Sequence, residues 1–157
     1  MARAKPKPRA SLYDRDFFAW TQEQAALLRQ GAARQQDTHL DLEHLAEEID
    51  SLGKRDRRAL STNIARVIEH LLKLQYSRSH EPRAGWETSV DVHRTKASKI
   101  LADSPGLRRE LPNLLGESYH DGRRWAARSL RSEVDSKAFA ESCPYTLEQI
   151  LDHDWWP

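Results

Sequence analysis

Apolar residues recur at spacings of three and four over one long stretch of the chain. Leu60, Ile64, Val67, Leu71 and Leu74 keep this register without interruption. A repeat of 3.6 residues places them on one face of an α-helix about five turns long. Strand-like alternation of apolar and polar residues is hard to find anywhere in the sequence. The pattern therefore predicts an all-α protein.

Glycine and proline residues divide the remaining periodic stretches into further helices. Helices are expected at about 14–31, 41–52, 54–76, 86–100, 105–125 and 146–151. Gly31 and Gly53 are natural stops, and Pro112 should kink or restart the fifth helix. Residues 129–142 have the composition of a weakly structured connection. Short breaks between long helices favour antiparallel neighbours, which predicts an up-and-down helical bundle of about five helices plus a short C-terminal helix.

The length of 157 residues suits one domain, expected over residues 11–157. Residues 1–10 carry four basic residues and no acid, interleaved with Pro6 and Pro8, although the net charge of the chain is only +1. This composition is typical of an extended, disordered basic tail. Such a tail could contact nucleic-acid phosphates, or it could simply be a solvated leader.

Cysteine content and hydropathy indicate in which cellular compartment the protein is expected. The chain has one cysteine, Cys143, so it has no internal disulfide framework. The longest purely aliphatic run, Ala25 to Leu28, is too short to cross a bilayer, and no apolar segment follows the basic start. We therefore expect a cytoplasmic protein with no membrane partner.

Charges are segregated between residues 37 and 58. Residues 37–50 hold six acidic residues and no Lys or Arg, and Lys54, Arg55, Arg57 and Arg58 follow directly. Two solvent-exposed helix faces of opposite charge that pair with each other explain this pattern. The same residues could supply contacts to a partner protein, or the basic ones could contact nucleic acid together with the tail.

Two groups of residues could form a metal or acid–base site. His44, Glu47 and Glu48 have the spacing at which one helix can offer an imidazole and a carboxylate to one ion, although a surface acidic helix is the favoured explanation, because His44 and Glu47 point away from the apolar stripe. His93 lies on the apolar stripe of the fourth helix, and His70 at the edge of the third could approach the same interior with Glu69 or Glu48 as carboxylate partner. The structural alternative is a hydrogen-bonded core histidine that fixes helix register.

Other chemistry has little support in the sequence. Glu117 and His120 match the Glu-x-x-His spacing of di-iron bundles, but the motif occurs once and Glu117 lies off the apolar face, so we reject such a centre. Cys143 could act as a nucleophile with His153 as base, but lone cysteines are commonly inert. No Gly-rich phosphate loop, Cys-x-x-Cys pair or Gly-x-Ser-x-Gly elbow occurs.

Several motifs in one order resemble a known bacterial family. They are Tyr13–Trp20 with Gln24–Arg29, Leu40–Gly53, His70–Lys73, Ser104–Leu107 and the ending Cys143–Thr146 through Trp156–Pro157. Together they are similar to the family of domain of unknown function twenty-nine, over about residues 13–157. The resemblance implies an all-helical bacterial protein and no particular activity. One departure is that Phe139 precedes Ala140, where the family tends to have Phe-Pro ahead of its Cys-Pro-Tyr.

Taken together, the sequence favours a non-catalytic interaction or regulatory protein whose partner is a protein. Candidate partner-binding residues are Arg55, Arg58, Trp155 and Trp156, although two C-terminal tryptophans more often fold back over their own bundle. The alternative is a metal-binding protein or metal-dependent enzyme that uses a subset of His44, Glu47, Glu48, His70 and His93. Weak nucleic-acid binding is a further alternative. No cofactor is assigned, and the oligomeric state is open.

Overall fold

The computed structural model describes residues 10–34 and 39–157, and these residues form helices joined by loops, with no strand. The prediction of an all-α fold is confirmed. The elements are α1 (Leu12–Arg15), α2 (Phe17–Ala33), α3 (Leu42–Tyr76), α4 (Arg83–Asp103), the 3-10 helix η1 (Pro105–Glu110), α5 (Leu111–Ser129), the 3-10 helix η2 (Ser136–Ala138) and α6 (Leu147–Leu151). The predicted basic tail lies outside the described residues, apart from Ala10.

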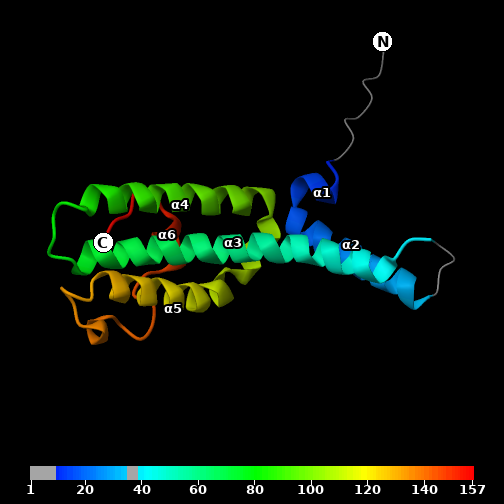
Figure 1. Cartoon of the computed structure of the whole chain (residues 1–157). Helices are drawn as coiled ribbons and strands as arrows, with labels where there is room; N and C mark the ends of the chain where they lie inside the picture. The colour runs from blue at the N-terminus through cyan, green and yellow to red at the C-terminus, as the bar shows by residue number, and fades with distance from the viewer. Residues whose placement is uncertain (1–9, 35–38) are drawn as a thin grey trace, which may run out of the picture.

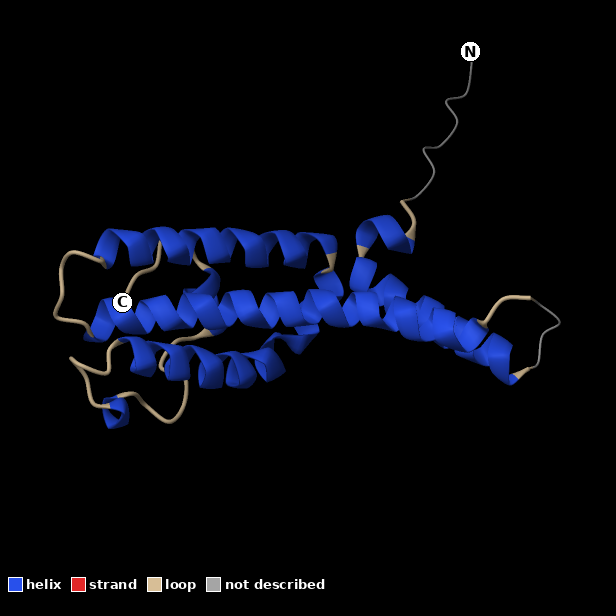
Figure 2. Ribbon diagram, viewed as in Figure 1, coloured by secondary structure: helices blue, strands red, loops and turns tan. Residues whose placement is uncertain are grey.

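The long helix α3 is the axis of the molecule (Figure 1). Its C-terminal half packs against α4 and α5 to form a three-helix bundle, and α6 is inserted beside this bundle. Its N-terminal half extends beyond the bundle and packs along α2, which runs antiparallel to it (Figure 2). Consecutive long helices are antiparallel, as predicted, but they divide into a bundle and a projecting two-helix arm.

The predicted boundary at Gly53 is wrong, because α3 runs through it without a break. Gly53 is buried where α2 crosses closely, and a Cβ at this position would overlap Thr21 Oγ1 and lie 3.3 Å from the Phe18 ring. The glycine therefore permits close packing of two helices rather than ending one. Ala46 and Ala25 keep the same seam narrow nearer the tip of the arm, where both are fully buried.

Helix ends follow local capping chemistry. Ser11 forms a capping box with Asp14 that starts α1, and the Asp16 side chain caps α2 by accepting from the Ala19 N–H. The first helix is thus split at Asp16 instead of starting at Asp14. The helix restarts near Pro112 as expected, since η1 gives way to α5 at Leu111. The short helix predicted at 146–151 is present as α6, and Thr146 starts it with a capping box that has Gln149 as its partner.

Large aliphatic side chains fill the bundle, in contrast to the arm. The seam of α3 continues through Leu60, Ile64, Val67 and Leu71, all with no exposed surface. Leu107, Leu114 and Ile150 are equally buried and come from η1, α5 and α6. Burying a side chain of this size contributes about 1.5–3 kcal/mol, so most of the stability of the fold belongs to the bundle.

Ser104 joins the base of the arm to the bundle. It occupies the N-cap position of η1, but its side chain makes no cap hydrogen bond. Its buried Oγ instead accepts from the Phe18 N–H at 3.2 Å and lies 3.2 Å from Asp56 Oδ2. Ser104 is therefore a link between α2, α3 and η1. None of the helices in the described part of the chain has the length and hydropathy needed to span a bilayer.

Candidate interaction groove beside α5

Three adjoining hollows lie along the outer side of α5. Their volumes are about 490, 270 and 510 Å³, in order from the start of the helix to its end. The first and second share His120 and Arg123, and the second and third share Ala127 and Ser136. They therefore form one continuous depression between α5 and residues 131–143, which we name the α5 groove.

The first end of the α5 groove has an apolar floor. Its lining residues are Pro112, Leu115, Gly116, Tyr119, His120 and Arg123 on α5 and Glu141, Ser142 and Cys143 opposite. The Tyr119 hydroxyl donates to the Ala140 carbonyl, and the Arg123 guanidinium donates to the Phe139 carbonyl at 3.1 Å. Phe139 is buried against Tyr76, with ring centroids 4.9 Å apart. These contacts fix the wall of the groove against the bundle.

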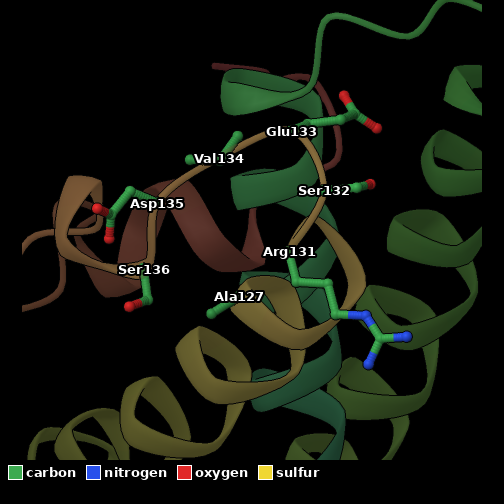
Figure 3. A pocket seen from close by; sticks show the side chains of 7 residues that line it. All are labelled: Ala127, Arg131, Ser132, Glu133, Val134, Asp135 and Ser136. Carbon is green, nitrogen blue, oxygen red and sulfur yellow. The ribbon is translucent and has the colours of Figure 1, made fainter.

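The other end is formed by the loop after α5 (Figure 3). Glu133 points away from Asp135 and Ser136 in this loop. Its carboxylate accepts from the hydroxyls of Ser77, at 2.8 Å, and Ser79 in the α3–α4 turn, and these hydrogen bonds lower the Glu133 pKa. Asp135 caps η2 by accepting from the Lys137 N–H at 2.9 Å. Both carboxylates are thus committed to holding the loop.

Four cationic side chains line the α5 groove beside the carboxylates Glu133, Asp135 and Glu141. Arg123, Arg124, Arg131 and Lys137 line it, and only Arg124 has a carboxylate partner among the described residues, Asp121 at 3.0 Å. Arg131 and Lys137 are exposed. Cations without a counter-charge attract an anionic ligand, at a strength that depends on salt. The arrangement can therefore bind an acidic group beside an apolar one.

The thiol in the α5 groove has the wrong protonation state for a nucleophile. Burial raises the pKa of Cys143, which keeps the thiol protonated at neutral pH. His153, the base suggested by the sequence, instead approaches Asp91 of α4, with Nδ1 and Oδ1 3.3 Å apart. The geometry therefore gives no support to a Cys143–His153 pair.

The five metal candidates fall in two distant places. His44, Glu47 and Glu48 lie on the arm, while His70 and His93 lie in the bundle. His44 and His70 are about 39 Å apart along α3, so the two sets cannot share an ion. Within residues 10–34 and 39–157, no three His, Cys, Asp or Glu side chains gather as a metal site requires. Metal binding by a subset thus stays a prediction.

The three candidate histidines, His44, His70 and His93, have different immediate environments. His44 Nδ1 is 2.6 Å from Asp41 Oδ2, and this hydrogen bond raises the His44 pKa. His93 Nδ1 is 2.8 Å from the Asn63 side-chain oxygen, which matches the hydrogen-bonded histidine considered as the structural alternative. Burial lowers the pKa of His70 to about 4, and its Nδ1 has no hydrogen-bond partner. At neutral pH His70 is therefore uncharged.

The proposed carboxylate partners of these histidines are placed elsewhere. Glu69 is buried and pairs with Lys73 at 2.6 Å and Arg66 at 2.8 Å. Glu48 is on the arm, about 33 Å along α3 from His70, so it is wrong as a partner. The charged groups around His70 consequently form an ion-pair network along α3 rather than an open site.

The candidate partner-binding residues also lie in two different parts of the structure. Arg55 and Arg58 are exposed on α3, and the Arg58 Nε donates to the Lys54 carbonyl at 3.2 Å. Trp155 is half-buried against Tyr145, with ring centroids 5.6 Å apart, so this part of the tail folds back on the bundle. Trp156 keeps 38% of its surface exposed.

A buried arginine holds the C-terminal segment, and no sequence argument indicated it. Arg94 of α4 has no exposed surface. Its guanidinium donates to the carbonyls of Ile150 (2.9 Å), Gln149 (3.0 Å) and Trp155 (2.9 Å), and it lies 5.0 Å from the Trp156 ring. Backbone carbonyls leave no trace in a residue pattern, which is why this clamp was missed.

Comparison with known proteins agrees with this architecture. The chain belongs to the family described as domain of unknown function DUF29, whose model matches residues 12–156. Among solved structures, it is similar to an α-helical protein of unknown function from Rhodospirillum rubrum, with a TM-score of 0.75 and 22% sequence identity. The match covers 94% of this chain and 93% of that chain, and it shows the shared fold. A search of curated proteins gave no match.

Proposed function

We propose that this protein is a non-catalytic interaction protein of the bacterial cytoplasm that binds an acidic segment of a partner protein in the α5 groove. The observation that carries the proposal is the continuity of the groove together with its cations, of which Arg123, Arg131 and Lys137 have no carboxylate partner among the described residues. Acidic side chains of a partner would supply the missing counter-charges.

The dimensions of the α5 groove suit a short extended segment. The groove follows α5 from Pro112 to the end of the helix at Ser129, a rise of about 26 Å, and Arg131 lies just beyond in the loop. An extended peptide covers about 3.4 Å per residue, so about eight residues would fill this length. Leu115 and Tyr119 at one end would take an apolar side chain, and Arg131 and Lys137 at the other would take carboxylates.

The charges beside the α5 groove favour an acidic peptide over a nucleic acid. Glu133, Asp135 and Glu141 alternate with the cations along the wall, so a peptide whose carboxylates are spaced to meet the cations fits better than a phosphate backbone that is charged at every residue. On α3, Lys54 already pairs with Asp50 at 2.8 Å and Arg57 with Glu117 at 3.1 Å, which leaves two of the four basic residues that the sequence grouped together. The supporting charges are therefore local rather than spread over a face.

Selection from a phage-displayed random octapeptide library, followed by fluorescence polarisation with the best peptide, tests the proposal. We expect enriched peptides with several Asp or Glu residues. Binding should weaken at least tenfold in the Arg131→Glu/Lys137→Glu variant, since two attractions become repulsions. Arg128→Glu is the matched control, because Arg128 is exposed on α5 but does not line the groove.

Two outcomes would overturn the proposal. One is enrichment of neutral or basic peptides, or of acidic peptides that bind the double variant equally well. The other is binding of a single-stranded or duplex DNA probe that exceeds binding of the selected peptide and is lost in the same double variant. The second outcome would favour the nucleic-acid alternative.

A further inference from the structure

The two ends of the α5 groove are held in place by different parts of the protein. At the apolar end, the Phe139 and Ala140 carbonyls accept from Arg123 and Tyr119, which belong to α5 itself. At the other end, no side chain of α5 makes a hydrogen bond to residues 131–138 in the described part of the chain. The two ends can therefore respond separately to a change elsewhere in the fold.

Glu133 connects the loop at this second end to the α3–α4 turn. Its Oε2 atom accepts from the Ser77 hydroxyl at 2.8 Å and from the Arg78 N–H at 3.2 Å, and its Oε1 atom accepts from the Ser79 hydroxyl at 3.2 Å. The three donors use both carboxylate oxygens, and hydrogen bonds to an ionised group are stronger than those between neutral groups. We name this set of contacts the Glu133 latch.

The Glu133 latch has no counterpart elsewhere in the loop. Every other hydrogen bond that residues 131–138 make, as far as the structure describes them, stays within positions 130–139. Two of these run from the N–H groups of Glu133 and Val134 to the Leu130 carbonyl, and Val134 also packs partly buried against the core. Such contacts shape the turn after α5, whereas the latch joins it to a segment 54 to 56 residues earlier in the chain.

The exposed cations at this end of the α5 groove flank the latch residue in the sequence. Arg131 lies two residues before Glu133, and Lys137 lies four residues after it. Both cations line the groove, and neither has a carboxylate within ion-pair distance among the described residues. Since Coulomb attraction falls with distance, the strength with which they attract an acidic ligand depends on where the loop places them.

Glu133 thus acts on an acidic ligand in two opposite ways. Its negative charge lines the same hollow as Arg131 and repels the ligand, although the side chain is directed away from Asp135 and Ser136 and three donors already compensate part of its charge (Figure 3). Its hydrogen bonds hold the loop that positions Arg131 and Lys137. Removal of the carboxylate therefore strengthens binding if the charge dominates and weakens binding if the latch dominates.

We propose that the α3–α4 turn controls the recognition of acidic side chains by the α5 groove, with Glu133 as the positioning residue that connects the two. The inference rests on the proposed function for its ligand, an acidic segment of a partner protein, and adds the regulation of that site. A change at the turn that removes the three donors releases the cationic end of the groove and leaves the apolar end in place.

Fluorescence polarisation with the selected acidic octapeptide tests the control of binding. Glu133→Ala should weaken binding about fivefold or more, because the loop is released. Glu133→Gln should bind at least as tightly as the wild-type chain, since the amide keeps an acceptor oxygen for the turn and carries no charge. Ser77→Ala/Ser79→Ala changes no charge of the groove and should weaken binding about threefold or more. The triple variant should stay within about twofold of Glu133→Ala, because both changes remove the same hydrogen bonds.

Glu141→Ala is the matched control for the sign of the effect. Glu141 lines the apolar end of the α5 groove, is exposed, and makes no hydrogen bond within the residues that the structure describes. Its removal takes the same charge from the wall without breaking a latch, so binding should tighten. The opposite responses of Glu141→Ala and Glu133→Ala separate the position of the loop from the charge of its wall.

Hydrogen exchange without peptide measures the latch independently of any ligand. In Glu133→Ala, peptides from residues 131–138 should exchange about fivefold faster or more, while those from residues 139–143 should keep the wild-type rate because Tyr119 and Arg123 still hold them. Unchanged exchange of residues 131–138 would overturn the proposal. So would tighter peptide binding by Glu133→Ala. If selection yields no acidic octapeptide, the proposed function fails, and the exchange rates still decide whether Glu133 holds the loop.

Discussion

At the scale of single residues, His70 makes the stability of the protein dependent on pH. Burial lowers its pKa to about 4, with Glu69 opposing the shift and Lys73, His93 and Arg66 reinforcing it. An unfolded histidine titrates near 6.5. Between pH 6.5 and 4 the unfolded chain therefore binds a proton that the folded chain does not, and the free energy of unfolding falls as the pH falls.

His70→Leu should remove much of this dependence. From pH 7 to pH 5 the wild-type chain is expected to lose about 1–3 kcal/mol of its unfolding free energy. The variant should lose less and should be at least as stable at pH 7, because a buried nitrogen without a partner disappears. Urea unfolding at several pH values measures both quantities. His80→Leu, a change at an exposed turn residue, should keep the wild-type slope, and an unchanged slope in His70→Leu would contradict the argument.

At the scale of elements, α5 contains a matched pair of glycines with opposite roles. A Cβ at Gly122 would lie 2.6 Å from the Ala65 carbonyl oxygen and 3.0 Å from Ile68 Cγ2 of α3, whereas a Cβ at Gly116 would meet nothing within 4 Å. Gly116→Ala should raise the unfolding free energy by about 0.5–1 kcal/mol through helix propensity. Gly122→Ala should lower it by about 1–3 kcal/mol, because α5 must move away from α3.

The urea midpoints of the two variants measure the difference in unfolding free energy. Because both glycines lie in α5, the gain in helix propensity is the same in both variants and cancels when they are compared. If both substitutions stabilise the protein, α5 does not pack on α3 as closely as described. The comparison therefore tests how closely α5 packs on α3, and this packing positions the α5 groove.

The helices could be predicted from the sequence where apolar spacing is regular, but their packing partners could not. The stripe from Leu60 to Leu74 correctly predicts the C-terminal half of α3. Gly53 was misread, although Ala46, Gly53, Leu60, Val67 and Leu74 follow at intervals of seven and are all buried. That interval runs through the glycine and was the signal for one continuous helix.

The α5 groove had no comparable signal. Its wall is positioned by the Tyr119 hydroxyl and the Arg123 guanidinium, which bind carbonyls of residues 140 and 139. Contacts between a side chain and a distant backbone carbonyl depend on the course of the chain, not on residue type at the acceptor. The histidine and carboxylate candidates, by contrast, were chosen for their type, and the helix geometry then separated His44 from His70.

At the scale of the whole molecule, the arm and the bundle differ in how much apolar area they bury. The seam of the arm contains alanine, glycine and threonine, while the bundle buries leucine and isoleucine. In dilute solution, hydrogen exchange should therefore be at least about tenfold faster for peptides from residues 20–33 and 42–52 than for residues 60–74. Mass spectrometry of the exchanged peptides measures this. Uniform protection along α3 would mean that arm and bundle open together.

The clamp at Arg94 sets an order of events during synthesis of the chain. Its acceptors, the carbonyls of Gln149, Ile150 and Trp155, lie 55 to 61 residues further along the sequence. A ribosome adds them after α3 and α4 have been synthesised, and until then a guanidinium destined for the interior lacks these carbonyls. That side of the nascent bundle therefore stays open to water until residues 149–155 arrive and close the core.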